Sequence, residues 1–352
     1  MYAPGDVRVI DAPDPRIEAP TDALLRLVRT CVCGSDLHPY HSIRPNPRGR
    51  SMGHEYLGIV EEVGADVATV KPGDLVIVPF VFSCGVCDFC RAGLQTSCRI
   101  GGVGTRLGSE GAQAELLRVP LADGTLYPVD ADEEHYAGLL TLSDVYGTGW
   151  HAAVTGGAGP GRSVTVIGDG AVGLLAVLSA RQLGAERIIL MGRHEARTDL
   201  GRAFGATDVV AARGEEGIEA VRELTDGDGC HVVLEAVGHL PAYEQALGVV
   251  RPGGRIARVG VPQYAEGPIG RVQFDRNVTI TGGVAPVRAY IDRLLPGILD
   301  GTVDAGRVFD VELPLEDLPC ESGRRHRQLS RFAHPFAAQF ILWRTDDQSF
   351  RS

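Results

Sequence analysis

The sequence predicts an α/β protein of two domains, a small β domain followed by a domain built on a parallel sheet. Its 352 residues are more than one compact core usually holds, which favours two domains. The first third alternates short apolar runs with Gly, Pro and Asp, whereas strand-like and helix-like segments alternate from about residue 145. We therefore expect the architecture to change near residue 145.

The first domain is predicted from four runs in which Val, Ile and Leu lie between turn-forming residues. These runs are "DALLRLVRTCVCG", "GHEYLGIVEEVG", "GDLVIVPFVF" and "AQAELLRVP". Short runs of this composition, separated by Gly, Pro and Asp, are typical of strands joined by tight turns. We expect a small antiparallel or barrel-like β domain.

The second domain is predicted from "RSVTVIGDGAVGLLAVLSARQLGAERIILMG", which fits a strand, a Gly-rich turn, an apolar helix and a second strand. This is a βαβ unit, the element of a parallel sheet. Further strands are expected at "HVVLEAVG" and "GRIARVG". Beyond about residue 285, "VRAYIDRLLPGILDGTVD" is expected to be helical.

Charge and hydropathy exclude several functions. The net charge of −11 argues against non-specific binding to nucleic acid or to anionic membranes. The N-terminal "MYAPGDVRVIDAP" lacks the basic and apolar stretches of a signal peptide, and no apolar run approaches the roughly 20 residues that span a bilayer. We expect a cytoplasmic protein, in which eight cysteines serve as free thiols, metal ligands or catalytic groups rather than disulfides.

A dinucleotide site is predicted in "VIGDGAVG", where Gly168, Gly170 and Gly173 fit G-x-G-x-x-G between a strand and a helix. The first glycine would allow the tight turn, the second the approach of a pyrophosphate, and the third close packing of helix and strand. The first N–H groups of the helix, from Ala171 and Val172, would bind phosphate. The alternative is a glycine-rich surface turn.

The second strand of this unit indicates which nicotinamide is bound. NAD sites usually place an acid after this strand to bind ribose hydroxyls, but here the strand is followed by Gly192, Arg193 and His194. Gly192 leaves room for a 2′-phosphate, and the two basic side chains can pair with it. We expect NADP(H) to be favoured over NAD(H). The alternative is that Arg193 is an ordinary surface arginine.

Two sets of candidate metal ligands are present. Cys84, Cys87, Cys90 and Cys98 lie in one short segment whose spacing suits a closed tetrahedral zinc site, with a redox dithiol as the alternative. The second set is scattered over three segments, and its members are Cys33, Ser35, Asp36, His38, His54, Glu55 and Asp144. Taken singly, these residues suit a buried thiol, a core histidine or a helix cap.

Taken in order, Cys-Gly-Ser-Asp-x-His, Gly-His-Glu, the cysteine segment and the glycine turn resemble the zinc-dependent alcohol dehydrogenases of the medium-chain dehydrogenase/reductase superfamily. The resemblance runs from about residue 5 to about residue 318. It implies a GroES-like, β-barrel-type catalytic domain and a Rossmann domain, with a catalytic zinc in the cleft between them. The implied domains are 1–145 with a structural zinc lobe at 84–98, then 146–285, and a return to the catalytic domain over 286–352.

The resemblance also implies roles for single residues. Cys33, His54 and Asp144 match the catalytic zinc ligands, with Asp144 at a position where many members have cysteine and some secondary-alcohol dehydrogenases have aspartate. The four clustered cysteines match the structural zinc site. Glu55 and Asp36 match a carboxylate close to the metal and one that orients the histidine ligand. Ser35 and His38 match a proton relay to solvent.

We therefore expect a dehydrogenase with two Zn²⁺ ions, which transfers a hydride between a small secondary alcohol or polyol and NAD(P)⁺ and forms a homodimer or homotetramer. The alternatives are a zinc-independent quinone or enoyl reductase of the same fold, and a non-catalytic protein that binds zinc and nucleotide. After about residue 319 the sequence becomes Arg-, Ser- and His-rich and departs from the family pattern. A divergent end and a shifted reading frame both explain this tail.

Overall fold

The computed structural model of the chain describes residues 1–103, 111–265, 267, 270–315 and 341–344. The chain divides into two compact units. The first comprises Met1–Asp144 and Pro286–Ser352, and the second comprises Val145–Ala285. The second unit is thus inserted between two parts of the first along the chain.

The first unit is mainly β, with short helices in its connections. Its strands are β1 (Ala23–Cys31), β2 (Tyr56–Val63), β3 (Leu75–Val78), β4 (Val81–Phe82), β5 (Gly102–Val103), β6 (Leu116–Val119), β7 (Tyr127–Pro128), β14 (Val311–Pro314) and β15 (Ile341–Arg344). Its α-helices are α1 (Gly34–Ser42), α2 (Asp88–Arg91), α3 (Ala122–Thr125), α4 (Tyr136–Thr141) and α11 (Ile291–Leu299). Its 3₁₀-helices are η1 (Gln95–Ser97), η3 (Glu133–His135), η4 (Val287–Tyr290) and η5 (Ala305–Val308).

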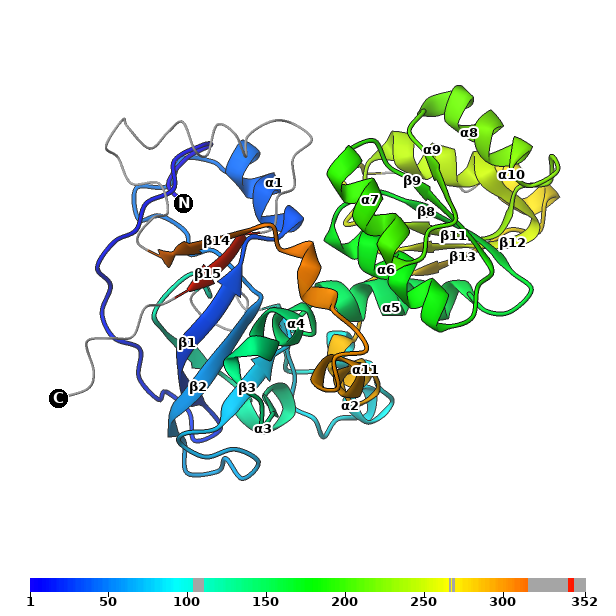
Figure 1. Cartoon of the computed structure of the whole chain (residues 1–352). Coiled ribbons are helices and arrows are strands. Elements are labelled where there is room, and N and C mark those ends of the chain that lie inside the picture. The colour runs from blue at the N-terminus through cyan, green and yellow to red at the C-terminus, as the bar shows by residue number, and fades with distance from the viewer. Residues whose placement is uncertain (104–110, 266, 268–269, 316–340, 345–352) are drawn as a thin grey trace. The chain divides into compact units, whose positions relative to one another are not determined.

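Strand β1 is the centre of the main sheet in this unit, whose order is β14-β15-β1-β2-β3-β7 with β6 also paired to β1. Strands β1, β2 and β3 lie side by side in Figure 1. The pairing of β1 with β2 is antiparallel and places Thr30 opposite Tyr56. Because both residues lie at strand ends, this register brings the segment after β1 close to the segment before β2.

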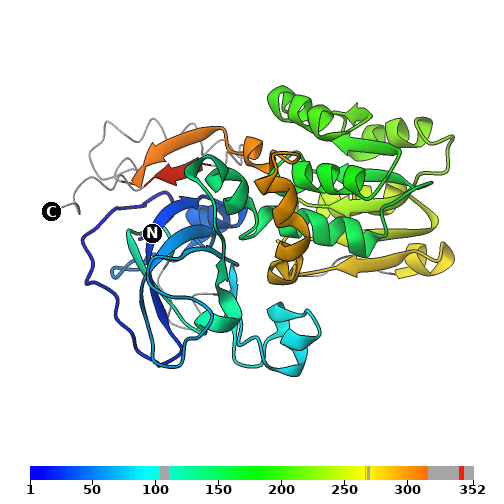
Figure 2. The same ribbon diagram turned by 60° about the horizontal axis from the view of Figure 1, so that its bottom comes forward.

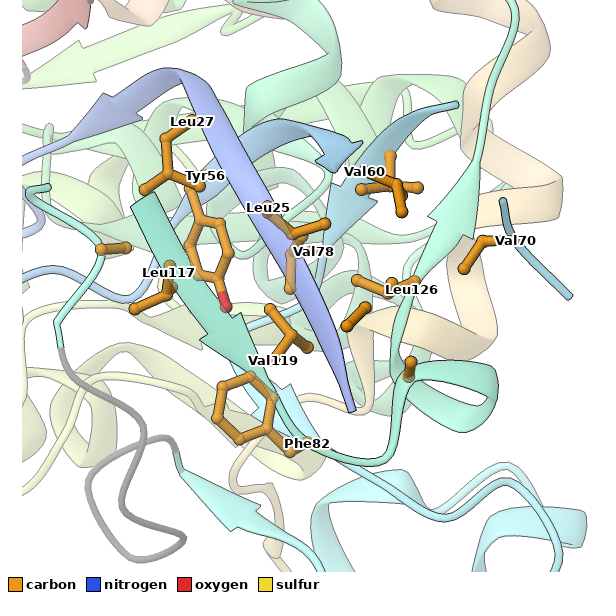
Figure 3. Packing of buried hydrophobic residues seen from close by; sticks show 14 residues of the cluster. Leu25, Leu27, Tyr56, Val60, Val70, Val78, Phe82, Leu117, Val119 and Leu126 are labelled. Atoms are coloured by element: carbon orange, nitrogen blue, oxygen red, sulfur yellow. The ribbon is translucent and has the colours of Figure 1, made fainter. Parts of the chain in front are cut away.

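The core of the first unit is formed mainly by side chains from β1, β2, β3, β4 and β6. Leu25 and Leu27 of β1 pack with Val78 of β3, Leu117 of β6 and Tyr56 of β2 (Figure 3). The alternation of buried and partly buried residues along β1 is the pattern of a strand with one face on the core. The small β domain predicted from the sequence is therefore confirmed.

Strand β15 shows that part of the unusual tail takes a regular place in the fold. Ile341–Arg344 pair in parallel with β14 and antiparallel with β1, and β14 and β15 lie side by side in Figure 2. Consecutive Ile, Leu and Trp favour a strand. The other residues after about 319 lie outside the described residues.

The second unit is an alternation of strands and helices. Its strands are β8 (Ser163–Ile167), β9 (Arg187–Met191), β10 (Asp208–Val210), β11 (Cys230–Glu235), β12 (Val250–Arg258) and β13 (Thr279–Gly282). Its helices are α5 (Val145–Gly156), α6 (Ala171–Gln182), α7 (Glu195–Phe204), α8 (Gly214–Glu223), α9 (Leu240–Val249) and α10 (Gly270–Asp275).

The strands of the second unit form one parallel sheet in the order β10-β9-β8-β11-β12-β13. This order has the doubly wound Rossmann arrangement, in which the chain reverses direction beside β8. Helices α5, α6 and α7 pack together in one layer, and α8 packs with α9 in the other (Figure 1). The predicted parallel sheet is confirmed, and its switch point lies between β8 and β11.

None of the helices in the described part of the chain is long and apolar enough to cross a membrane.

Candidate metal and cofactor sites

The four clustered cysteines converge on one point in the segment that includes α2 and η1. Their sulfur atoms all lie within 4.8 Å of one another. Cys87 Sγ is 3.5 Å from Cys90 Sγ, and Cys84 Sγ is 4.0 Å from Cys90 Sγ. Tetrahedral zinc with Zn–S bonds of about 2.3 Å requires sulfur separations of about 3.8 Å, so this donor set fits zinc.

Backbone N–H groups surround these sulfurs. The Cys84 N–H donates to Cys98 Sγ at 3.2 Å, and the Cys87 N–H donates to Cys84 Sγ at 3.4 Å. Hydrogen bonds from the backbone of Arg99 and Cys90 lower the pKa of the Cys87 thiol to about 6. In contrast, burial and the neighbouring Cys87 raise the pKa of Cys90 to about 12. The lobe thus offers at least one thiolate before any metal binds.

A second donor set gathers residues that are far apart in the sequence. The ligand atoms of Cys33, His54, Glu55 and Asp144 all lie within 4.8 Å of one another. His54 Nε2 is 3.5 Å from Asp144 Oδ2 and 3.7 Å from Glu55 Oε1. Thiolate, imidazole and carboxylate are all zinc ligands, and three of them leave a position for substrate.

Backbone contacts explain how these segments meet. The Thr30 hydroxyl at the end of β1 donates to the Glu55 carbonyl at 2.9 Å, which ties the approach to Cys33 to the approach to β2. The Phe80 N–H donates to the Ser143 carbonyl at 3.0 Å and holds the segment that carries Asp144. Phe80 also packs edge-on against the His54 ring, with centroids 6.3 Å apart.

Helix α1 begins directly after Cys33 and carries Ser35, Asp36 and His38. Asp36 Oδ2 accepts a hydrogen bond of 3.0 Å from the Cys33 N–H, while Asp36 Oδ1 faces His54 Nδ1 at 3.6 Å. Ser35 Oγ is 3.4 Å from His54 Nε2, on the side of the ring where the other donors lie. His38 follows Ser35 by three residues and therefore shares its face of the helix.

The buried acidic groups of the second set favour the binding of a cation. Glu55 is fully buried, and neither carboxylate oxygen has a hydrogen-bond partner among the described residues. Burial and the Asp144 carboxylate raise the pKa of Glu55 to about 8, and burial together with Glu55 raises that of Cys33 to about 12. Burial lowers the pKa of His54, but Asp36 and Asp144 outweigh it and hold this pKa well above its usual value. A metal ion would compensate this buried negative charge.

A cavity of about 100 Å³ reaches the second set within the first unit. Its described lining includes His54, Met52, Phe80, Phe82 and Tyr56. The Tyr56 side chain is buried and its hydroxyl has no hydrogen-bond partner among the described residues. Figure 3 shows this hydroxyl pointing toward Phe82 and Val119. A buried hydroxyl usually has a partner, and this one belongs to a residue that lines the cavity.

In the second unit, the glycine turn has the geometry that phosphate binding requires. Gly168 has φ +113°, which favours glycine. A Cβ at Gly173 would lie 2.0 Å from the Gly168 carbonyl oxygen, so only glycine allows this packing. A Cβ at Gly170 would meet none of the described atoms within 4 Å. Gly170 is the N-cap of α6, and the N–H groups of Ala171 and Val172 lie in the first turn of this helix.

The environment of Gly192 differs from the one expected. The sequence predicts that Gly192 leaves room for a 2′-phosphate with no carboxylate beside it, but Asp169 occupies the space beside Gly192: a Cβ at Gly192 would lie 2.6 Å from the Asp169 Cβ. Asp169 Oδ2 accepts hydrogen bonds from the N–H groups of Arg193 at 2.9 Å and His194 at 3.0 Å. The acid comes from within the glycine turn, where a sequence search for a residue after β9 does not find it.

Comparisons with known proteins agree with these sites. The family model described as "Alcohol dehydrogenase GroES-like domain" matches residues 19–130, and "Zinc-binding dehydrogenase" matches residues 171–295. A probable zinc-binding alcohol dehydrogenase of Mycobacterium tuberculosis is 36% identical over 318 residues, which cover 89% of this chain and 81% of the relative. The chain belongs to the zinc-binding alcohol dehydrogenase family. It is therefore an oxidoreductase, as the resemblance implied.

Solved structures show the same relationship. The alcohol dehydrogenase of Thermus sp. ATN1 superposes with a TM-score of 0.85 at 34% identity, covering 98% of this chain and 99% of that one. A putative zinc-binding dehydrogenase from Sinorhizobium meliloti 1021, bound to NADP, superposes with a TM-score of 0.79 at 26% identity, covering 97% of each chain. These matches confirm the predicted fold class, a GroES-like domain with a Rossmann domain.

The structure brings together every ligand predicted for each metal site and places Ser35 and Asp36 beside His54. Their binding and catalytic roles stay predictions. Sequence reasoning missed Asp169 and Tyr56. For Asp169 a signal existed, since an acid inside the glycine turn coincides with a glycine at position 192. Tyr56 gave no signal, because a tyrosine at the start of a strand is common.

Proposed function

We propose that this protein is a zinc-dependent, NADP-linked dehydrogenase that interconverts a small secondary alcohol or polyol and its carbonyl product. The convergence of Cys33, His54 and Asp144 within 4.8 Å carries this proposal. Zn²⁺ held by these side chains would act as a Lewis acid toward the substrate oxygen, and the nicotinamide would accept or return the hydride. The four-cysteine site would hold a second Zn²⁺ that has no open position and serves the fold.

The chain's own residues would orient the ligands and move the proton. Asp36 faces His54 Nδ1 and so leaves Nε2 directed toward Asp144. Ser35 Oγ lies close enough to this donor set to accept the proton of a bound alcohol. His38, one turn further along α1, would pass that proton to solvent. The buried Glu55 would contribute a further carboxylate close to the metal.

The cavity supports a small substrate. Its volume of about 100 Å³ suits a molecule of a few heavy atoms, and Met52, Phe80 and Phe82 would contact an apolar body. The Tyr56 hydroxyl would bind a second polar group, which favours a diol or polyol over a simple alkanol. In the second unit, the glycine turn would bind the cofactor pyrophosphate, and Arg193 with His194 would bind the 2′-phosphate.

A single assay tests the proposal. Purified protein with its zinc content measured is screened for absorbance change at the nicotinamide band, with NADP⁺ and NAD⁺ against primary, secondary and polyol substrates and against carbonyl compounds. We expect two zinc ions per chain and a higher kcat/KM with NADP⁺. Zinc-replete protein without hydride transfer to any of these substrates would contradict the proposal. Light scattering in the same preparation tests whether the protein is a dimer or tetramer.

A further inference from the structure

The side chain of Asp169 forms its hydrogen bonds with the loop that follows β9. Asp169 is 8% exposed. One oxygen of its carboxylate, Oδ2, accepts three hydrogen bonds. The donors are the N–H groups of Arg193 and His194 and the His194 Nδ1, the last at 2.8 Å. The other oxygen, Oδ1, is 3.9 Å from an Arg197 guanidinium nitrogen. The carboxylate therefore fixes two successive backbone units.

Asp169 also determines which residue can follow β9. A Cβ added at Gly192 would lie 2.6 Å from the Asp169 Cβ and 3.1 Å from its Cγ and Oδ2. Such an approach to a Cβ atom cannot be relieved by rotation of the Asp169 side chain. An acid at position 192, which would bind the ribose hydroxyls of NAD, is therefore incompatible with any side chain at position 169.

The loop carries the basic residues Arg193 and His194, with Glu195 in the first turn of α7 after it, while Glu215 and Glu216 lie in the first turn of α8. Arg213 is the N-cap of α8. Burial lowers the pKa of Arg213 and the nearby Arg193 guanidinium lowers it further, while the Asp169 carboxylate raises it, so two like charges lie near one acid. A dianionic phosphate between them would relieve this repulsion.

We propose that Asp169 is a positioning residue that directs this protein toward NADP(H), by holding the Arg193–His194 backbone and by excluding a side chain at position 192. Its carboxylate accepts hydrogen bonds from the Arg193 and His194 N–H groups. These bonds place the two basic residues at the edge of the nucleotide site. The inference rests on the proposed NADP(H) linkage.

The test measures binding of two cofactor fragments, adenosine 2′,5′-bisphosphate and 5′-AMP, to the zinc-loaded full chain by calorimetry. We expect the native protein to bind the bisphosphate more tightly. Asp169→Asn should weaken bisphosphate binding at least about tenfold, because charged hydrogen bonds are lost, and should change 5′-AMP binding less than about twofold. Asp199→Asn is the control, since this exposed acid of α7 pairs with Arg202.

Arg193→Ala distinguishes the proposed NADP(H) linkage from the proposed positioning role of Asp169. If the native protein shows no preference for the bisphosphate, the NADP(H) linkage itself is wrong. If Arg193→Ala abolishes the preference but Asp169→Asn keeps it, the linkage stands and the positioning role is wrong.

A double variant tests the exclusion at position 192 even if Asp169→Asn is unstable. Asp169→Gly removes the Cβ that blocks this position, so Asp169→Gly with Gly192→Asp should bind 5′-AMP better than the bisphosphate and should raise kcat/KM for NAD⁺ relative to NADP⁺. Gly192→Asp alone should lower the melting temperature and weaken both fragments. If Gly192→Asp alone is as stable and as selective for NAD⁺ as the double variant, the exclusion is wrong.

Discussion

The two sets of metal ligands in this protein differ in how their donors are assembled. The cysteines at 84–98 come from one short segment, and backbone N–H groups of that same segment bond their sulfurs. Cys33, His54 and Asp144 come from three separate segments that meet through sheet register and backbone contacts. The local set can form wherever its own loop folds, whereas the scattered set exists only when the first unit is complete.

The difference extends to charge. In the local set, hydrogen bonds lower the pKa of Cys87 to about 6. In the scattered set, burial raises the pKa of Cys33 to about 12 and that of Glu55 to about 8. A loop whose thiol pKa is already lowered before metal binds is suited to a structural metal site. A buried set of donors whose raised pKa values a bound cation would lower is suited to chemistry.

The largest expected effect is on turnover. His54→Ala should lower kcat/KM at least about a thousandfold, because the Lewis acid contributes several kcal/mol and its ligand is lost. Zinc content should fall from two to one per chain, with 5′-AMP binding retained. His41→Ala, which changes an exposed histidine of α1, is the control. Full activity in His54→Ala would remove this set from catalysis.

Replacing a lobe cysteine should act on stability. Cys87→Ser should also remove one zinc, but it should lower the free energy of unfolding by an amount on the order of several kcal/mol, since metal binding is coupled to folding of the loop. Turnover per folded molecule should persist at low temperature. Cys230→Ser, outside both sets, should keep two zinc ions. An unchanged zinc content in Cys87→Ser would contradict the structural-zinc assignment.

Ser35→Ala separates proton transfer from metal binding within the scattered set. We expect kcat to fall about a hundredfold, the usual contribution of a positioned proton acceptor, while both zinc ions remain. The pH profile of kcat should change, which a purely structural serine would not cause. Unchanged kcat and pH profile would place the proton route elsewhere.

The two sets should also take up zinc with different pH dependence. Binding at the scattered set must displace protons held by Cys33, by Glu55 below pH 8 and by His54, whose pKa is raised. In the lobe, hydrogen bonds lower the pKa of Cys87 to about 6, and burial of Cys98 is outweighed by backbone hydrogen bonds that lower its pKa, although the pKa of Cys90 is raised to about 12. Affinity should therefore rise more steeply with pH between 6 and 8 at the scattered set.

Metal analysis after dialysis of stripped protein at each pH measures this uptake, with His54→Ala and Cys87→Ser assigning the sites. Equal pH slopes at the two sites would contradict the contrast drawn from the pKa shifts.

The smallest expected effect concerns the cavity beside the scattered set. Tyr56→Phe removes one hydroxyl, so kcat/KM for a diol should fall about three- to tenfold while that for the matching alkanol is unchanged. Equal losses for both substrates would show that Tyr56 only packs.

The sequence alone determined the fold class and predicted both ligand sets. Strand-like runs, the glycine turn between strand and helix, and the cysteine spacing are local patterns, and their physical causes act over a few residues. The convergence of Cys33, His54 and Asp144 was predicted only because their order resembles a known family. Spacing alone could not place residues that are up to 111 positions apart beside each other.

The tertiary structure decided what depends on contact between distant segments. The sequence places no acid directly after β9, yet the Asp169 carboxylate from the turn after β8 accepts hydrogen bonds from the Arg193 and His194 N–H groups there. Strands β8 and β9 are parallel neighbours, so their carboxyl ends meet at one edge of the sheet. Similarly, the Tyr56 hydroxyl is seen to lack a partner among the described residues only when its surroundings are assembled. Packing decides which side chain occupies a space that two segments share, and packing cannot be predicted from either segment alone.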